Sequence, residues 1–282
     1  AAGELVPAFE ALDAASIGVA DMYNGAEYYF QGKNIGFNFF TAVPFGMTAN
    51  ELNAWIDHGG GKELWNKLSA QFNVISFQSA NTGVQMGGWF NKEIKTIDDL
   101  KGLKIRMPGL GGEVLRRVGS AAVAIPGGEI YPALQSGAID ATEWVGPWND
   151  EAMKFHEAAK YYYYPGMHEP GSMLACGVNK SWFTSLTKSD QTIIKTACAW
   201  ADEITMAEYN AKNGAALARL VNENGVKLEK FNDKVYDAFA KGAQEVYDEV
   251  QQHSDLAART HAAFVKARKE IGSWTNLSDS PY

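Results

Sequence analysis

The sequence predicts an α/β fold with two lobes, and two observations support this prediction. Its 282 residues exceed the usual size of a domain with a single core. Short apolar segments typical of strands also alternate with short amphipathic segments typical of helices. From Gln85 to about Cys176 this alternation is compact, so we expect one lobe there, built around a mainly parallel sheet.

The first 82 residues are expected to supply most of the other lobe. Apolar residues recur at helical spacing in the first segment, at Leu5, Phe9, Leu12 and Ile17. Residues 18–30 follow as a short strand and an aromatic loop, and residues 48–73 hold two helical patterns separated by three glycines. The segment 73–78 has the pattern of a strand, and the NTGVQ sequence that begins at Asn81 is a candidate crossing between lobes.

The stretch from Asp99 to Asp150 predicts three strands separated by two helices. The strand LKIRMP ends at Pro108 and Gly109, the helix GGEVLRRVG ends at a glycine, and the strand VAIPG follows. The helix EIYPALQSG then leads to a third strand, AIDATEW. Since ligands of open α/β sheets lie beyond the carboxyl ends of strands, a small carboxylate is expected to lie between the side chains at two such ends, Arg106 and Glu143.

The last third of the chain is mainly helical. Thr187 is the expected N-cap of a long helix, with Asp190 three positions on. Its expected apolar face consists of Ile193, Ile194, Ala197, Trp200 and Ile204. A break at Asn224 and Gly225 and a short strand, VKLEKF, precede a second helical region from about Asp233 to Ile271.

These patterns together predict three parts. Residues 1–82 and 178–222 form the first lobe, and residues 83–177 form the second lobe, which carries Arg106 and Glu143. Residues 223–282 form a helical region that packs across both lobes or against another subunit.

Composition excludes several classes of protein. The formal net charge is −8, with 25 Lys and Arg against 33 Asp and Glu, so a nucleic-acid or anionic-membrane partner is not expected. Cys176 and Cys198 lie in apolar segments and are too few for a disulfide framework or a thiolate zinc site. No apolar segment is long enough to cross a bilayer, and AAGELVPAFEALDAA lacks the pattern of a secretion signal.

Arg106 is the most informative single residue, because a guanidinium at the end of a buried strand needs an anionic partner or solvent. Two interpretations are equally weighted on the residues alone: a structural ion pair, and a grip on a ligand carboxylate. Each charge-assisted hydrogen bond of such a grip contributes on the order of 1.5 to 3 kcal/mol. That free energy is enough to set the class of ligand.

Glu143 precedes a turn at Gly146 and Pro147, and an exposed acid is the commonest role for such a residue. Gln85 and Glu169 are further oxygen donors near predicted strand ends. A glutamine, a carboxylate and a main-chain carbonyl form an all-oxygen set, which suits sodium or calcium rather than zinc.

Other motifs carry less information. GLGG, from Gly109 to Gly112, lacks the third glycine of a dinucleotide-binding turn, and we interpret it as a tight strand–helix turn whose amides help to hold an anion. The five histidines show no zinc spacing, and no G-x-S-x-G nucleophile motif occurs. The aromatic runs 28–30 and 161–164 are expected mainly in the core or between lobes.

Several longer motifs closely resemble one family over essentially the whole chain. They are AAGELVPAFEALDA, FTAVPFGM, NTGVQMGGWFNKEI, DLKGLKIRMPGLGGEV, PGGEIYPALQSGAIDATEWVGPWND and KYYYYPGMHEPG. The chain resembles the solute-binding proteins of tripartite ATP-independent periplasmic (TRAP) transporters, the DctP family, and within it the α-keto-acid-binding TakP branch. IRMPG and DATEWVGP are specific for this family. The resemblance implies a type II-like periplasmic-binding-protein fold with a ligand cleft between lobes and long C-terminal helices.

The resemblance also implies a role for each site residue. Arg106 would grip the carboxylate of a small monocarboxylate, such as pyruvate, another α-keto acid or lactate. Sodium or calcium would bridge that ligand to the Gln85 side chain, the Glu143 carboxylate and the main chain of Trp144, so that Gln85 and Trp144 also contact substrate. Glu169, Tyr29 and Phe30 match positions near the substrate.

The family further implies a periplasmic location, a signal peptide in the precursor, delivery of the ligand to membrane subunits of a TRAP transporter, and in some relatives a homodimer through the long C-terminal helix. Family members begin with a strand, a helix and a second strand before the AAGEL motif. We therefore expect this chain to be an incomplete record of a longer protein, or a marginal fold with exposed sheet edges.

Three other functions are possible on the sequence alone. One is a metal-assisted lyase or hydrolase with Glu143 as base, which needs a second titratable group that the sequence does not identify. A second is a nicotinamide enzyme using GLGGEV, which needs the missing glycine. The third, a purely structural protein, gives Arg106 no role. We therefore expect a binding protein without catalytic activity.

Overall fold

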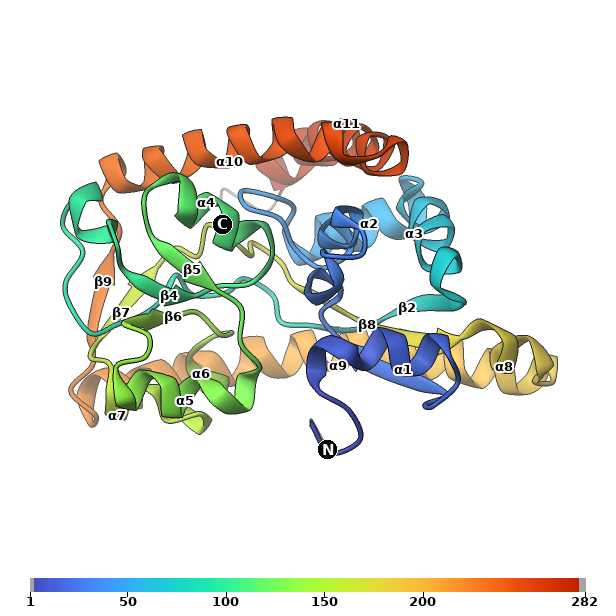
Figure 1. Ribbon diagram of the computed structural model, residues 1–282, viewed down its shortest axis with the longest axis horizontal. Helices are drawn as coiled ribbons and strands as arrows, with labels where there is room; N and C mark the ends of the chain where they lie inside the picture. Colours follow the sequence, from blue (N-terminus) through green and yellow to red (C-terminus); the bar gives the residue numbers. More distant parts are fainter. Residues whose placement is uncertain (1–2, 279–282) are drawn as a thin grey trace.

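The computed structural model describes residues 3–278, and it contains two β-sheets in two lobes (Figure 1). The first sheet has the order β1-β8-β2, formed by β1 (Met22–Gly25), β8 (Met173–Asn179) and β2 (Val74–Asn81). β8 runs antiparallel to both neighbours, and a bulge interrupts its pairing with β2 between Gln78 and Ala80. The first sheet therefore joins segments from both halves of the chain.

The second sheet has six strands in the order β5-β4-β6-β3-β7-β9. They are β5 (Ala121–Val123), β4 (Lys104–Arg106), β6 (Ala141–Thr142), β3 (Gly88–Phe90), β7 (Tyr161–Tyr164) and β9 (Lys227–Lys230). β4 is parallel to β5 and β6, and β7 is parallel to β9, whereas β3 runs antiparallel to both of its neighbours. The expected mainly parallel sheet is thus a mixed sheet, because the chain enters the lobe through the reversed strand β3.

Most helices of the two lobes are short. α2 (Ala49–His58) and α3 (Gly61–Ser69) are separated by glycines, and Thr48 and Glu51 form a capping box at the start of α2. The second lobe carries α4 (Gly109–Arg117), α5 (Gly127–Ser136), α6 (Pro147–Ala152) and α7 (Phe155–Ala158). α8 (Lys180–Ser185) follows β8. α2 to α5 correspond to expected helices, whereas α6, α7 and α8 were not predicted.

Three long helices connect the lobes. α9 (Lys188–Asn222) has 35 residues and packs against β2 in one lobe and α6 in the other. α10 (Asp233–His253) packs on α4, and α11 (Asp255–Ser278) packs on α2 and α3. In Figure 1 α9 crosses one side of the molecule, and α10 and α11 cross the other. The C-terminal helices α10 and α11 thus contact elements of both lobes.

Chain crossings between the sheets refine the expected boundaries. The crossing after β2 falls in NTGVQ, as expected, since β2 ends at Asn81 and β3 begins at Gly88. The boundary placed after residue 177 falls inside β8, so the return to the first sheet lies between β7 and β8. With this shift, we retain the three-part division of the chain as a proposal.

Two predicted apolar helix faces differ from the structure. The first helix is only α1 (Ala11–Ser16), preceded by a 3-10 turn (Ala8–Glu10), and Leu5 and Ile17 are exposed. On α9, Ile193, Trp200 and Ile204 are exposed, because the helix turns the opposite face, which includes Cys198 and Asp202, towards the first lobe. The helical spacing there is confirmed, but the predicted buried face is wrong.

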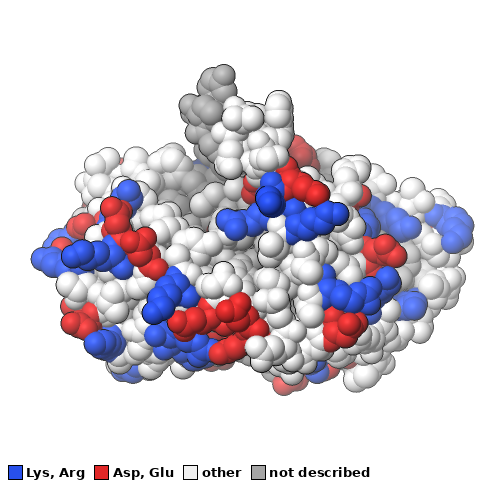
Figure 2. Space-filling view, turned by 90° about the horizontal axis from the view of Figure 1, so that it is seen from above, with Lys and Arg blue, Asp and Glu red and all other residues white. Residues whose placement is uncertain are grey.

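The aromatic runs pack largely as expected. Tyr162 and Tyr163 are buried on opposite faces of β7, and Tyr162 stacks on Trp89 with ring centres 4.0 Å apart. The two cysteines are buried, also as expected. Within residues 3–278, no helix is both long and apolar enough to cross a membrane. Figure 2, which looks onto α10 and α11, shows acidic and basic side chains lying side by side.

Candidate functional site

Arg106 and Glu143 meet at the carboxyl ends of two neighbouring parallel strands. Arg106 is the last residue of β4 and lies opposite Thr142 of β6, and the Glu143 amide donates to the Arg106 carbonyl oxygen at 3.1 Å. The Arg106 guanidinium donates to the Glu143 carboxylate through Nη1 and Oε1. Their side chains are 1% and 0% exposed, so this is a fully buried ion pair.

Further contacts fix the guanidinium from other sides. Arg106 Nε donates to the Ile125 carbonyl oxygen at 3.2 Å, and Nη2 donates to the Tyr29 hydroxyl at 3.0 Å. The Trp144 ring centre lies 5.2 Å from the guanidinium carbon, within the range of a cation–π contact. Burial acts to lower the pKa of Arg106, but the charge of Glu143 and the effects of the Tyr29 and Tyr28 hydroxyls together outweigh it, and the pKa is raised. The residue is therefore a permanent buried cation.

The second carboxylate oxygen of Glu143 faces His168. His168 Nε2 lies 3.3 Å from Glu143 Oε2, but neither nitrogen of His168 nor this oxygen makes a hydrogen bond to a described residue. Burial acts to lower the pKa of His168, whereas its close contact with the Glu143 carboxylate raises it above its ordinary value. Glu143 thus lies between two basic groups, Arg106 and His168.

Glu169 and Gln85 complete the buried cluster. The Gln85 amide donates to the Glu169 carbonyl oxygen at 3.1 Å, which ties the crossing after β2 to the crossing after β7. Burial, and then the charge of Glu143, raise the pKa of Glu169 to about 7. The Gln85 side chain donates to Thr82 Oγ1 at 3.2 Å, which leaves its carbonyl oxygen free to accept.

The polar atoms left without a partner fit a hard cation. Three buried oxygens of this cluster have no hydrogen bond to a residue within 3–278: Gln85 Oε1, Glu143 Oε2 and Glu169 Oε2. Ligand atoms of Glu143, His168 and Glu169 all lie within 4.8 Å of one another. Buried oxygens without partners are costly, and several oxygen ligands are what sodium and calcium require. The donor set therefore suits such an ion.

The GLGG turn positions the site but does not supply an anion hole. Gly109 has φ +64°, and a Cβ there would meet Asn38 Oδ1 at 3.0 Å; at Gly111 a Cβ would meet the His168 Cβ at 2.6 Å. The Leu110 amide donates to Asn38 Oδ1 at 3.2 Å. The glycines thus let α4 approach the site closely, and the expectation that their amides hold an anion is not supported.

The structure gathers most of the residues singled out in the sequence. Arg106, Glu143, Trp144 and Tyr29 are in direct contact, and Gln85 and Glu169 are joined to each other beside them. Phe30 lies elsewhere: its ring packs edge-on against those of Tyr23 and Phe37 in the core. Tyr29 and Phe30 are adjacent in a 3-10 turn (Glu27–Phe30), so their side chains point in different directions.

Sequence reasoning missed two residues of the cluster. His168 was dismissed for lack of zinc spacing, although it adjoins Glu169 in the HEPG motif. Tyr28 is buried beside Gly109, and its hydroxyl contributes a hydrogen bond to Glu169 that acts to lower the pKa of that carboxyl. Zinc spacing gives no signal for His168. Its position directly before the candidate carboxylate Glu169 is the sequence feature that indicates it.

Comparison with known proteins places the chain. The model of the bacterial extracellular solute-binding proteins, family 7 (DctP), matches residues 1–254. A monocarboxylate 2-oxoacid-binding periplasmic protein of Nostoc sp. is 43% identical over 282 residues, which are 100% of this chain and 77% of that protein.

Two crystal structures of TRAP periplasmic solute-binding proteins are also similar. The Colwellia psychrerythraea protein, with bound calcium and pyruvate, has a TM-score of 0.93 and 41% identity. The Pseudoalteromonas atlantica protein, with bound sodium and pyruvate, has a TM-score of 0.93 and 39% identity. Each comparison covers 97% of this chain and 83% of the other. The chain therefore belongs to family 7 of the bacterial extracellular solute-binding proteins, the DctP family of TRAP transport systems.

Proposed function

We propose that this protein is an extracytoplasmic TRAP solute receptor for a small 2-oxo monocarboxylate such as pyruvate, with lactate as the related 2-hydroxy acid. The observation that carries the proposal is the buried Arg106 guanidinium beside oxygens that have no partner. The pyruvate bound with calcium or sodium in two similar proteins supports the same class of ligand.

Arg106 would bind the ligand carboxylate directly. Its guanidinium offers a planar set of donors that matches a carboxylate, and its contacts with Ile125 and Tyr29 fix its orientation in advance. Trp144, stacked beside it, would form an apolar wall next to the ligand. A small ligand would therefore meet one cation and one aromatic surface.

A sodium or calcium ion would occupy the other half of the site. Gln85 Oε1 and Glu143 Oε2, which make no hydrogen bond to a described residue, would coordinate it together with the main chain of Trp144, and Glu169 Oε2 is a further candidate ligand. The ion supplies a positive charge that the carboxylate and the neighbouring oxo or hydroxyl oxygen of the ligand can share. A monocarboxylate that lacks the neighbouring oxo or hydroxyl oxygen would lose half of this chelation.

Charge balance requires the cation and the ligand carboxylate to bind together. In the closed site Glu143 and Arg106 neutralise each other, and a carboxylate alone or a sodium ion alone would add an unbalanced buried charge. A sodium ion and a monocarboxylate together add none. The proposal therefore includes positive cooperativity between ion and ligand.

Opening of the lobes would admit the ligand. Arg106, Glu143, Gln85, His168 and Glu169 are all buried in this structure, so solvent does not reach the cluster. Tyr29, from the first lobe, contacts Arg106 of the second, and that contact would break when the cleft opens. The membrane subunits of the transporter would recognise the closed, loaded form.

Assembly and location complete the proposal. We infer a periplasmic protein made with a signal peptide, which acts as a carrier without catalytic activity. A homodimer through α11 is supported by its exposed apolar residues Val265, Trp274 and Leu277. Light scattering with Trp274→Ser would test the dimer, and a wild-type monomer at micromolar concentration would contradict it.

Calorimetry tests the function. Pyruvate is titrated into protein freed of cations, into protein with sodium and into protein with calcium. Acetate, which lacks the 2-oxo oxygen, serves as the control. We expect tight pyruvate binding only with a cation, and a cation affinity raised by pyruvate by the same factor. Equal pyruvate affinity with and without cation would refute the bridging ion. Consumption of pyruvate by the protein would favour the lyase or hydrolase instead.

A further inference from the structure

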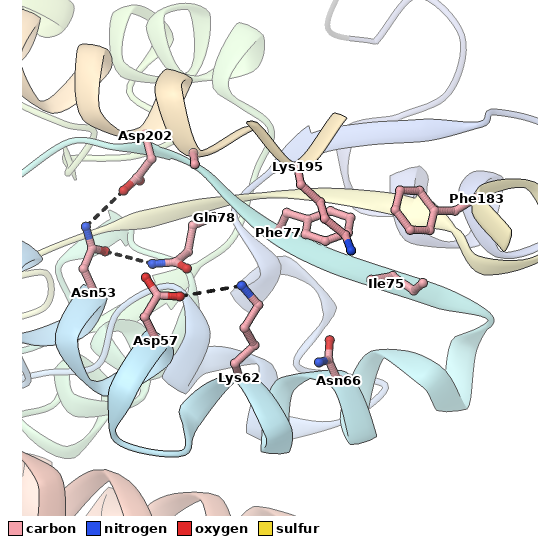
Figure 3. A pocket seen from close by; sticks show the side chains of 11 residues that line it. Asn53, Asp57, Lys62, Asn66, Ile75, Phe77, Gln78, Phe183, Lys195 and Asp202 are labelled. Atoms are coloured by element: carbon pink, nitrogen blue, oxygen red, sulfur yellow. Dashed lines mark hydrogen bonds and ion pairs between the residues drawn. The ribbon is translucent and has the colours of Figure 1, made fainter. Parts of the chain in front are cut away.

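A separate cavity lies in the first lobe, alongside β2 and between α2, α3 and α9 (Figure 3). Its volume is about 420 Å³. None of the residues that line it belongs to the cluster around Arg106, and its polar and charged side chains come from three different helices and from β2. The proposed function assigns no role to this cavity.

Asp202 forms one end of the cavity and carries an unused acceptor. Its side chain is 7% exposed, and Oδ2 accepts a hydrogen bond from Asn53 Nδ2 at 3.0 Å. Asn53 Oδ1 in turn accepts from Gln78 Nε2 at 3.2 Å, so the carboxylate is held in place. The other oxygen, Oδ1, is buried with no hydrogen-bond partner among the residues described. Burial raises the pKa of Asp202 to about 6, so the group is mainly ionised at neutral pH.

Lys195 supplies an uncommitted positive charge at the other end. It lies seven residues before Asp202 on the same face of α9, which corresponds to about 10 Å along the helix. Its ammonium lies 5.8 Å from the Phe183 ring centre and makes no ion pair with a described carboxylate. Asp57 and Lys62, which also line the cavity, are paired with each other at 3.6 Å. The two unmatched charges are therefore Asp202 and Lys195.

Apolar side chains form the wall between these charges. Ile75 and Phe77 project from β2, and Phe183 projects from α8. Ala199 lies between Lys195 and Asp202 on α9, and its small side chain leaves room there. Figure 3 shows Asp202 and Asn53 at one end and Lys195 and Phe183 at the other.

We propose that this cavity binds a small zwitterion, a free α-amino acid with an apolar side chain. Its ammonium group would donate to Asp202 Oδ1, its carboxylate would accept from Lys195, and its side chain would pack on Phe77. An α-amino acid with a hydrogen bond at each end spans about 9 Å between the two partners, which the flexible lysine can match. A simple amine would leave Lys195 unmatched, and a simple carboxylate would leave Asp202 unmatched.

The test is calorimetry with L-leucine on the full chain, in the presence of excess pyruvate and calcium so that the cluster around Arg106 is engaged. We expect one leucine per chain. We also expect binding at least about tenfold weaker for 3-methylbutylamine and for 4-methylpentanoate, each of which keeps only one of the two charged groups. Absence of leucine binding, or equal affinity for all three compounds, would overturn the proposal.

Variants locate the site. Asp202→Asn and Lys195→Met should each weaken leucine binding at least about tenfold and leave pyruvate binding unchanged. Asp237→Asn and Lys241→Met, at exposed positions of α10, are the matched controls and should change neither. Lys195→Met keeps the test decisive should Asp202→Asn unfold the lobe. Leucine binding that survives both cavity variants, or that competes with pyruvate, would place the ligand elsewhere.

Discussion

Removal of either partner of the Arg106–Glu143 pair should destabilise the protein far more than removal of both. Arg106→Met leaves Glu143 as a buried carboxylate with His168 as its remaining basic neighbour and Glu169 close by, and Glu143→Gln leaves the buried guanidinium without its counter-charge. Breaking a buried ion pair on one side costs about 3 to 5 kcal/mol of unfolding free energy. We expect each single variant to fall in that range, with Arg106→Met at the lower end because His168 provides partial compensation.

The double variant Arg106→Met with Glu143→Gln removes both charges and should recover most of that loss. It still lacks the hydrogen bonds from Arg106 to the Ile125 carbonyl and the Tyr29 hydroxyl, each of which contributes about 1 kcal/mol. We therefore expect it to be less stable than the wild type by about 1 to 3 kcal/mol. The sum of the losses of unfolding free energy in the two single variants should thus exceed the loss in the double variant by several kcal/mol.

Urea denaturation followed by circular dichroism measures these differences. Protein must be freed of pyruvate and cations, since either would stabilise the wild type selectively. Arg259→Met removes the exposed pair with Asp255 on α11 and should change stability by less than about 1 kcal/mol. Additive single effects would refute the view that the pair acts as one buried unit. Calorimetry on the same samples should show that all three site variants lose pyruvate binding.

Three other predictions concern single residues. Gln85→Leu should weaken calcium binding at least about tenfold, because its carbonyl oxygen has no hydrogen-bond partner among the described residues, and should lower stability by only about 1 kcal/mol through loss of the bond to Thr82 Oγ1; unchanged calcium affinity by calorimetry would exclude it as a ligand. Trp144→Ala should weaken pyruvate binding several-fold while Arg106 stays in place, and equal pyruvate affinity would exclude the aromatic wall. Burial raises the pKa of Asp150 to about 6, so the folded state holds this proton more tightly than the unfolded state. As pH rises from about 4 to 6, the unfolding free energy of the wild type should fall by up to about 3 kcal/mol relative to that of Asp150→Asn. The urea midpoint of Asp150→Asn should lack this dependence on pH. If the midpoints of both proteins changed with pH in parallel, the assignment to Asp150 would be contradicted.

Local patterns predicted the parts of the fold that depend on neighbouring residues. The glycine break between α2 and α3, the Thr187 cap of α9 and the break before β9 are all confirmed, because each depends on a few adjacent residues. The direction of β3 and the exposed face of α9 are not local properties. They depend on which segments far apart in the chain pair with each other, and spacing alone does not encode that choice.

The same distinction applies to the candidate site. Arg106 and Glu143 were found because each stands out within its own strand, and the parallel pairing of β4 and β6 then brings the two together. His168 was missed because its importance comes from a carboxylate 25 positions away in sequence, at 3.3 Å in space. A buried histidine without ligand spacing looks structural until its partner is known.

Under the proposed function, the two interpretations of Arg106 that the residues leave open, an internal ion pair and a carboxylate grip, would be two states of the same group. In the closed structure the guanidinium is paired with Glu143, which keeps both charges neutralised. Under the proposed function, a ligand carboxylate would replace Glu143 at Arg106 only if Glu143 gained another cation. Glu169 has an oxygen within 4.8 Å of Glu143, and the Gln85 side-chain oxygen has no hydrogen-bond partner among the described residues. With sodium as the ion, a dicarboxylate would bring a second negative charge that neither Arg106 nor the ion balances. A sodium-loaded site would therefore favour a ligand with one carboxylate, and the internal ion pair is the reason that the proposed mechanism requires a cation.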